Sequence, residues 1–244
     1  MTLKLRLRDH LSDPAKKRAF NEAVFEEVAP TYRIVNRVLS FGRDAAWKKH
    51  LVRSLPDADS PACVDLACGT GDLVALLLRR YPNARVTGVD LTRGMLDRAR
   101  ARFQDDPRVT FLQADLCQSG LPDASADIVT GGYALRNAPD LDTALAEVRR
   151  ILKPGGHAAF LDFSKPESPA LQKVEAALLK AWCGFWGFVV HGNPEVYTYV
   201  PASLAHFPNT AELRRLLGQR GFQDIRSRRF FAGVTEGVTF RKPA

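Results

Sequence analysis

The chain of 244 residues lacks the patterns that mark membrane-spanning, secreted and metal-binding proteins. It has no run of about 18 consecutive apolar residues, so we expect no segment to span a bilayer. The first ten residues alternate leucine with lysine and arginine and lack the apolar core of a secretory signal. The cysteines at 63, 68, 117 and 183 form no Cys-x-x-Cys pair and show no metal-ligand spacing. We therefore expect a cytoplasmic protein with reduced thiols and no metal.

The charge is positive overall and unevenly distributed. The net charge is +8, with 12 Lys and Arg against 6 Asp and Glu in residues 1–53 and 8 against 3 in residues 212–244. Basic ends are typical either of a solvated surface or of contact with nucleic acid or an anionic membrane. Because no motif for stacking single-stranded bases is present, we expect no nucleic-acid partner, and a non-catalytic RNA-binding protein is a remote alternative.

The segment 64–73 carries the most information. An apolar run containing Asp65 leads into the turn Gly69-Thr70-Gly71, and an amphipathic stretch follows. Glycines in such a turn let the backbone approach a ligand closely. The pattern is Gly-x-Gly, without the third glycine of the dinucleotide fingerprint.

Acidic residues end two further predicted strands. Asp90 follows Gly71 by 19 residues, which is where nucleotide-binding folds hold ribose hydroxyls, and Asp115 follows the next strand. The first loop holds no Arg or Lys to meet a diphosphate. The acidic pattern suits a cationic nucleoside, and we expect S-adenosylmethionine, with NAD as the second choice. The alternative is that these acids only cap helices.

Strands and helices alternate through the middle of the chain, which predicts an α/β fold. We expect a Rossmann-like, doubly wound, mostly parallel sheet of seven strands at 62–67, 84–90, 108–113, 126–131, 157–163, 222–232 and 234–240. Helices are expected at 71–80, 92–104, 140–151 and 209–219. A helical extension (1–56), with helices near 14–29, 30–42 and 44–55, precedes a domain (57–244) that contains a helical lid insert at about 168–206.

Ligands of such sheets bind at the carboxyl ends of the strands, beside the first strand. The residues expected to bind the cofactor lie along that edge: Asp65, Gly69, Thr70, Gly71, Asp90, Leu91, Asp115, Leu116 and Gly132.

Several motifs together point to a known family. They are Leu135-Arg136-Asn137, Lys153-Pro154-Gly155-Gly156, Phe163-Ser164-Lys165-Pro166 and Tyr197-Thr198-Tyr199. With the glycine turn, they make the chain resemble the ubiquinone/menaquinone C-methyltransferases of the UbiE type, which are class I S-adenosylmethionine-dependent methyltransferases. The resemblance implies methylation of a ring carbon on a prenylated quinol, with S-adenosylhomocysteine as the second product.

The chain departs from this family at three places. Arg33 stands where the family usually has Asp, Gly132-Tyr133-Ala134 replaces Ser-Phe-Gly, and Val238-Thr239-Phe240 lacks the usual His. These changes fall near the expected acceptor pocket, so the sequence does not determine the identity of the acceptor. A specialised methyltransferase acting on C, N or O of a soluble natural product is therefore an alternative.

Arg136 and Asn137 are the expected catalytic residues, because they can stabilise negative charge on a ring oxygen. Arg136 stays protonated, so it cannot itself be the base. The alternative is that Arg136 pairs with Asp140 as part of a helix cap.

The insert supplies the remaining candidates. Tyr197 and Tyr199 are expected to cover the acceptor, although alternating tyrosines are equally typical of a surface strand. His191 and His206 are candidate bases or plain surface residues.

The helix at 168–190 is apolar, and its end carries Trp182 and Trp186. It is expected either to cover the lipid pocket or to dip into the membrane interface, where tryptophan is favoured. The expected partner is thus a prenylated quinol or another aromatic acceptor, with reversible contact at the inner face of the membrane. A homodimer is left open.

Overall fold

A seven-stranded sheet forms the centre of the computed structural model, which describes residues 13–193, 197 and 199–244. The strand order is β3-β2-β1-β4-β5-β7-β6, and only β7 runs antiparallel to its neighbours. The chain order reverses at β1, which pairs with β2 on one side and β4 on the other. The strands are β1 (Ala62–Leu66), β2 (Arg85–Asp90), β3 (Val109–Gln113), β4 (Ala126–Gly132), β5 (Leu152–Phe163), β6 (Gln223–Phe230) and β7 (Thr235–Arg241).

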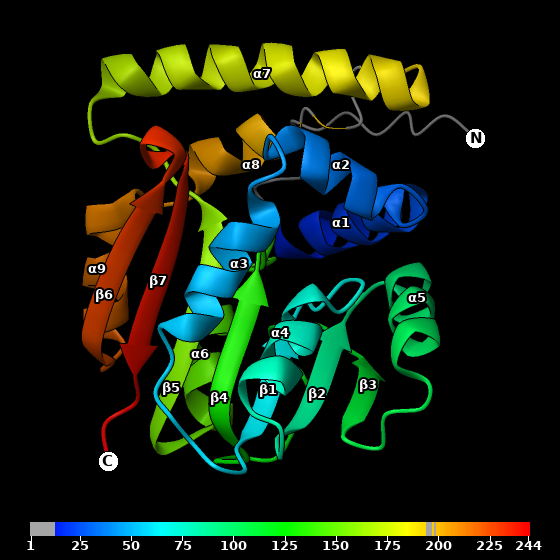
Figure 1. The fold of residues 1–244 in the computed structure, drawn as a ribbon. Coiled ribbons are helices and arrows are strands. Elements are labelled where there is room, and N and C mark those ends of the chain that lie inside the picture. Colours follow the sequence, from blue (N-terminus) through cyan, green and yellow to red (C-terminus); the bar gives the residue numbers. More distant parts are fainter. Residues whose placement is uncertain (1–12, 194–196, 198) are drawn as a thin grey trace.

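Helices cover both faces of the sheet (Figure 1). One face carries α3 (Asp44–Arg53), α4 (Asp72–Arg80) and α5 (Arg93–Phe103), whose apolar residues form one buried cluster with the sheet. The other face carries α6 (Leu141–Ile151) and α9 (Thr210–Gln219), which form a second cluster. The predicted doubly wound, mostly parallel fold is thereby confirmed.

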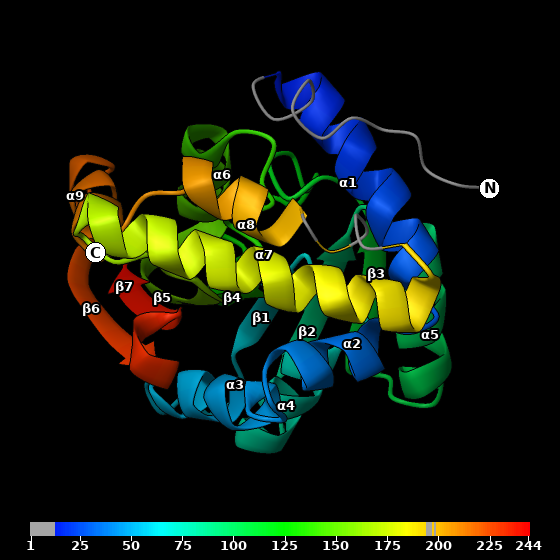
Figure 2. The same cartoon turned by 90° about the horizontal axis from the view of Figure 1, so that it is seen from above.

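A third layer lies over the carboxyl ends of the parallel strands (Figures 1 and 2). It consists of α1 (Pro14–Val28), α2 (Tyr32–Leu39), α7 (Pro169–His191) and α8 (Tyr199–His206). Their buried side chains, such as Phe20, Val35 and Val200, form a separate apolar cluster. The N-terminal helices and the insert therefore enclose the edge of the sheet at which ligands of this fold bind.

The main deviation from the predicted elements is at β5. Lys153-Pro154-Gly155-Gly156 was expected to precede a strand beginning at 157, but the strand begins at Leu152. Leu152 pairs with Ala126, and the register then shifts before His157 pairs with Ile128. Gly155 takes a φ of +77°, so the segment forms an irregularity inside the strand rather than a separate turn.

Candidate functional site

The glycine turn after β1 is fixed to the end of β2 by one carboxylate. The backbone N–H of Gly69 donates to Asp90 Oδ2 at 2.8 Å, and the N–H of Thr92 donates to Asp90 Oδ1 at 2.9 Å. Gly71 has a φ of +79°, and a Cβ there would lie 2.6 Å from Phe103 Cε2. The turn thus requires glycine both for its backbone conformation and for space. Burial raises the pKa of Asp90.

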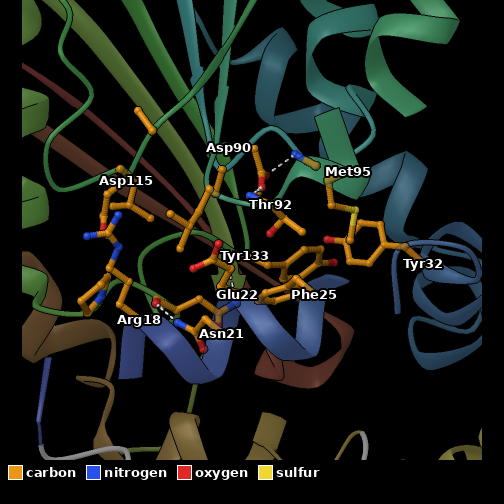
Figure 3. A pocket seen from close by; sticks show the side chains of 18 residues that line it. Arg18, Asn21, Glu22, Phe25, Tyr32, Asp90, Thr92, Met95, Asp115 and Tyr133 are labelled. Atoms are coloured by element: carbon orange, nitrogen blue, oxygen red, sulfur yellow. Dashed lines mark hydrogen bonds and ion pairs between the residues drawn. The ribbon is translucent and has the colours of Figure 1, made fainter. Parts of the chain in front are cut away.

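A pocket opens beside this turn and has the charge expected for a cationic nucleoside. Figure 3 shows Asp90 and Thr92 on one side of it, with Arg18 and Asp115 together and Tyr32 and Tyr133 further along. Among the described lining residues, Glu22, Asp90 and Asp115 are acidic and only Arg18 is basic. Asp90 retains lone pairs that can accept ribose hydroxyls. These residues fit S-adenosylmethionine, which carries a sulfonium and an ammonium.

Six of the nine predicted cofactor residues line this pocket: Gly69, Asp90, Leu91, Asp115, Leu116 and Gly132. Asp65, Thr70 and Gly71 do not. Asp65 is buried in β1, where it accepts a 2.8 Å hydrogen bond from Thr130 Oγ1 of β4 and where burial raises its pKa to about 7.

The first helix supplies lining residues that the sequence analysis did not assign. Arg18, Asn21, Glu22 and Phe25 of α1 all face the pocket. Arg18 Nε lies 3.2 Å from Asp115 Oδ2, so the two side chains close one end of the pocket. Nothing in the local sequence pattern distinguishes a pocket-lining aromatic residue such as Phe25 from a core residue.

A second, apolar cavity of about 370 Å³ adjoins the first. It lies between α2, α7, α8 and the segment after β4, and it includes aromatic residues such as Phe163 and Trp182. Four residues line both cavities: Phe25, Tyr32, Tyr133 and Asn137. An acceptor in the second cavity would therefore meet the cofactor across a wall of three aromatic rings and one amide.

Arg136 forms part of the wall of the second cavity and is itself buried. Its Nε lies 3.2 Å from Asp162 Oδ1, and its Nη1 donates to the hydroxyl of Ser203. The guanidinium carbon lies 5.3 Å from the ring centre of Phe163 and 5.7 Å from that of Tyr199. The alternative pairing with Asp140 is wrong, because Asp140 accepts from the backbone N–H of Thr143 as the cap of α6.

Asn137 lines both cavities, and its amide donor is already engaged. Its Nδ2 donates to the carbonyl oxygen of Tyr133 at 2.8 Å, and its Oδ1 is buried without a partner. Asn137 Oδ1 can therefore accept a hydrogen bond from a ring hydroxyl once a ligand reaches it.

Tyr197 and Tyr199 are both buried and line the second cavity, so the alternative of a surface strand is wrong. His206 is exposed at the end of α8, where its Nδ1 lies 3.1 Å from the carbonyl oxygen of Ala202. It does not line the cavity. The side chain of His191 lies outside the described part of the structure.

Comparison with known proteins agrees with this geometry. The sequence model of the ubiE/COQ5 methyltransferase family matches residues 14–239. The chain belongs to this family. It is an S-adenosylmethionine-dependent methyltransferase, so the alternatives of an NAD enzyme and of a non-catalytic RNA-binding protein are set aside.

Curated relatives of this methyltransferase align over most of their length. A demethylmenaquinone methyltransferase of Thermus thermophilus is 36% identical over 82% of this chain and 91% of its own. A ubiquinone/menaquinone biosynthesis C-methyltransferase of Desulfotalea psychrophila is 32% identical over 87% and 86%.

Solved structures of lower identity share the fold. An S-adenosylmethionine-dependent methyltransferase of Thermotoga maritima is 20% identical, with a TM-score of 0.65 over 90% of this chain and 99% of its own. A phosphoethanolamine N-methyltransferase of Haemonchus contortus, solved with S-adenosylmethionine, is 17% identical, with a TM-score of 0.61 over 82% and 53%.

In the part of the chain that the structure describes, no helix is long and apolar enough to cross a membrane, and no group of three His, Cys, Asp or Glu side chains is placed to hold a metal ion.

Proposed function

We propose that this methyltransferase transfers a methyl group to a ring carbon of a quinol that carries an apolar prenyl tail. The observation that carries the proposal is the apolar cavity that shares Tyr133 and Asn137 with the cofactor pocket and holds the Arg136 guanidinium in its wall. Relatives that are 32–36% identical are named for demethylmenaquinone or ubiquinone/menaquinone C-methylation, which supports the same acceptor class.

The cofactor pocket has a division of roles that follows from its contacts. S-adenosylmethionine supplies an electrophilic methyl group on a sulfonium. Asp90 is proposed to accept the ribose hydroxyls, and Asp115, Leu91 and Leu116 to surround the adenine. Gly69 and Gly132 line the pocket with backbone alone, and at Gly69 a Cβ would lie 3.5 Å from the Tyr32 ring in the pocket wall.

Across the shared wall, the proposed residues position the acceptor ring and stabilise its charge. A quinol carbon becomes nucleophilic as the ring oxygen gains negative charge, and the permanently charged Arg136 lies in the cavity where that charge develops. Asn137 Oδ1 can hold a ring hydroxyl, while Tyr197 and Tyr199 cover the ring and exclude water. Holding the ring carbon near the methyl group supplies much of the remaining acceleration.

The acceptor is tested by offering the purified enzyme a methyl-labelled cofactor with three acceptors. These are a prenylated demethylmenaquinol, the corresponding oxidised quinone and a soluble phenol of similar ring size. We expect a labelled C-methyl product from the quinol and none from the quinone, which lacks the electron-rich hydroxyl-bearing ring. Methyl transfer to oxygen or nitrogen of the soluble acceptor, without reaction of the quinol, would support the specialised methyltransferase instead.

The outer surface of α7 supports reversible contact with a membrane, from which a prenylated acceptor would enter. Phe185 and Phe188 are 56% and 65% exposed, and Leu171, Val174 and Val189 are also exposed on this helix. An apolar patch of this kind is favoured at a membrane interface. Trp182 instead stacks on Phe41, with ring centres 4.6 Å apart, and both residues line the second cavity, so Trp182 helps to cover that cavity.

Membrane contact is tested by co-sedimentation with anionic vesicles at increasing salt. We expect the wild type to sediment and salt to weaken binding, because part of the attraction is screened charge. Phe185→Ser with Phe188→Ser should reduce sedimentation while leaving cofactor affinity unchanged. Ala177→Ser, an exposed change on the same helix, is the matched control. Equal sedimentation of all three proteins would exclude this surface.

A further inference from the structure

Tyr133 lies at the boundary of the two cavities in an unusual backbone conformation. Its φ is +59°, the left-handed region that a bulky residue seldom occupies. Its N–H donates to the carbonyl oxygen of Leu161 at 2.6 Å, and its own carbonyl accepts from Asn137 Nδ2. Tyr133 lines the cofactor pocket, as Figure 3 shows, and also the second cavity, which is proposed to hold the acceptor and is called the acceptor cavity below. Backbone strain of this kind is concentrated at functional sites.

The hydroxyl of Tyr133 donates to a buried carboxylate. Its Oη lies 2.7 Å from Asp44 Oδ1 in α3, and Asp44 Oδ2 lies 2.8 Å from Lys48 Nζ. Lys48 in turn lies 3.1 Å from Asp72 Oδ2 at the start of α4. The Lys48 ammonium thus has two carboxylate partners and holds Asp44 in place beneath the ring. With its proton directed to Asp44, Tyr133 Oη keeps lone pairs that can accept a hydrogen bond from a ligand.

The proposed reaction needs a proton acceptor, and of the described residues that line both cavities Tyr133 is the one whose hydroxyl donates to a carboxylate. Arg136 is permanently protonated, and an amide such as Asn137 can accept a hydrogen bond but cannot take the proton. Glu175 lines the acceptor cavity but not the cofactor pocket. The reacting ring carbon must lie beside the cofactor, so the hydroxyl that activates it lies near the residues common to both cavities.

We propose that Tyr133 and Asp44 form a proton relay that removes the hydroxyl proton of the acceptor ring. The inference rests on the proposed quinol function. The ring hydroxyl gives its proton to Tyr133 Oη as the proton of Tyr133 passes to Asp44 Oδ1. The ring carbon then bonds to the methyl group while the carbon–sulfur bond breaks and its electron pair stays on sulfur. The methylated carbon then loses its proton to water, which restores the aromatic ring, and the ring oxygen regains a proton from Asp44 through Tyr133, so one proton is released to solvent overall.

Tyr133 is the catalytic member of the relay because it contacts the acceptor, whereas Asp44 acts through it. Tyr133→Phe removes the relay and keeps the ring. Asp44→Asn keeps an oxygen that can accept from Tyr133 but takes away the proton acceptor, while Asp72 remains as a partner of Lys48. Tyr32→Phe is the matched control, since Tyr32 lines the same two cavities but belongs to α2.

The experiment compares single-turnover methyl transfer to two quinols, one ordinary and one with fluorine substituents that leave its hydroxyl ionised at the assay pH. General-base catalysis contributes about 10²–10⁴-fold. We expect Tyr133→Phe and Asp44→Asn to lose about 100-fold or more on the ordinary quinol but only a few-fold on the ionised one. Cofactor affinity by calorimetry should stay within a few-fold, and Tyr32→Phe should show no dependence on acceptor acidity.

The outcomes separate the relay from the function on which it rests. Equal losses on both quinols would mean that Tyr133 and Asp44 have a structural role only, and the relay would be overturned. If Glu175→Gln, and not Tyr133→Phe, loses more methyl transfer on the ordinary quinol than on the ionised one, the base is Glu175 of α7 and the relay is overturned. If the wild type methylates neither quinol while it binds S-adenosylmethionine, the proposed function fails and the relay with it.

Discussion

Replacement of Arg136 by methionine tests whether its buried ion pair is structural as well as catalytic. The side chains of Arg136 and Asp162 are 2% and 7% exposed. Removing one partner of such a pair leaves an uncompensated buried charge and costs about 3–5 kcal/mol. One kcal/mol corresponds to roughly 2–4 °C in melting temperature for a chain of this size. We therefore expect Arg136→Met to melt about 6–20 °C below the wild type.

The double variant separates stability from turnover. Asp162 also accepts the backbone N–H groups of Arg136 and Phe163, and the amide oxygen of asparagine can keep one of these bonds. Adding Asp162→Asn to Arg136→Met removes the unpaired charge, so at least half of the lost stability should return. Methyl transfer to the quinol should not return, because the guanidinium is still absent. A melting temperature within about 2 °C of wild type for Arg136→Met, or recovered turnover in the double variant, would refute this reasoning.

The stability deficit of Arg136→Met should also depend on pH. Burial raises the pKa of Asp162, and the charge of Arg136 opposes that rise. Without Arg136 the folded-state pKa rises further above the unfolded value. A group with a raised folded-state pKa stabilises the fold below its unfolded pKa, and this contribution is lost as the pH rises through the folded pKa. The difference in melting temperature from wild type should therefore be smaller at about pH 5 than at about pH 8.

Three further predictions concern the cofactor pocket. Asp90→Ala should weaken S-adenosylmethionine binding at least tenfold by calorimetry, since hydrogen bonds to a charged group contribute about 1.5–3 kcal/mol; an unchanged dissociation constant would contradict the assignment. Gly71→Ala should lower the free energy of unfolding more than Gly42→Ala. Both positions have a positive φ, but only the Cβ at 71 would meet Phe103. Equal losses in chemical denaturation would show that Phe103 moves aside. Arg18→Ala should speed cofactor release in stopped-flow measurements, because the contact with Asp115 that closes the pocket is lost; an unchanged rate would mean that α1 is held by its other contacts.

The parallel sheet could be predicted from the sequence because its signals are local. An apolar run specifies a strand, an acid at its end marks the edge of the sheet where ligands bind, and a glycine turn specifies a tight connection. Each signal lies within a few residues. The same signals placed Asp90 and Asp115 at the pocket. They also included Asp65, which has the same strand-end pattern but is buried against Thr130 instead of lining the pocket, since sequence spacing does not say which way a carboxylate points.

Contacts between distant segments could not be predicted. Arg136 and Asp162 are 26 residues apart in sequence, and only the pairing of β4 with β5 brings the ends of their strands together. Tyr133 and Asp44 are 89 apart and meet because α3 packs on one face of the sheet, against α4 and β5. The sequence analysis noted the change at Tyr133, but the partner of its hydroxyl depends on tertiary packing.

The shared wall of the two cavities makes their ligands energetically dependent on each other. Phe25, Tyr32, Tyr133 and Asn137 face both, so a molecule that immobilises these side chains from one side prepares the surface that the other molecule meets. Such coupling is reciprocal: if bound cofactor raises the affinity for the acceptor by some factor, bound acceptor raises the affinity for the cofactor by the same factor. Enzyme molecules that have bound an acceptor would then retain S-adenosylmethionine more tightly than enzyme molecules without one.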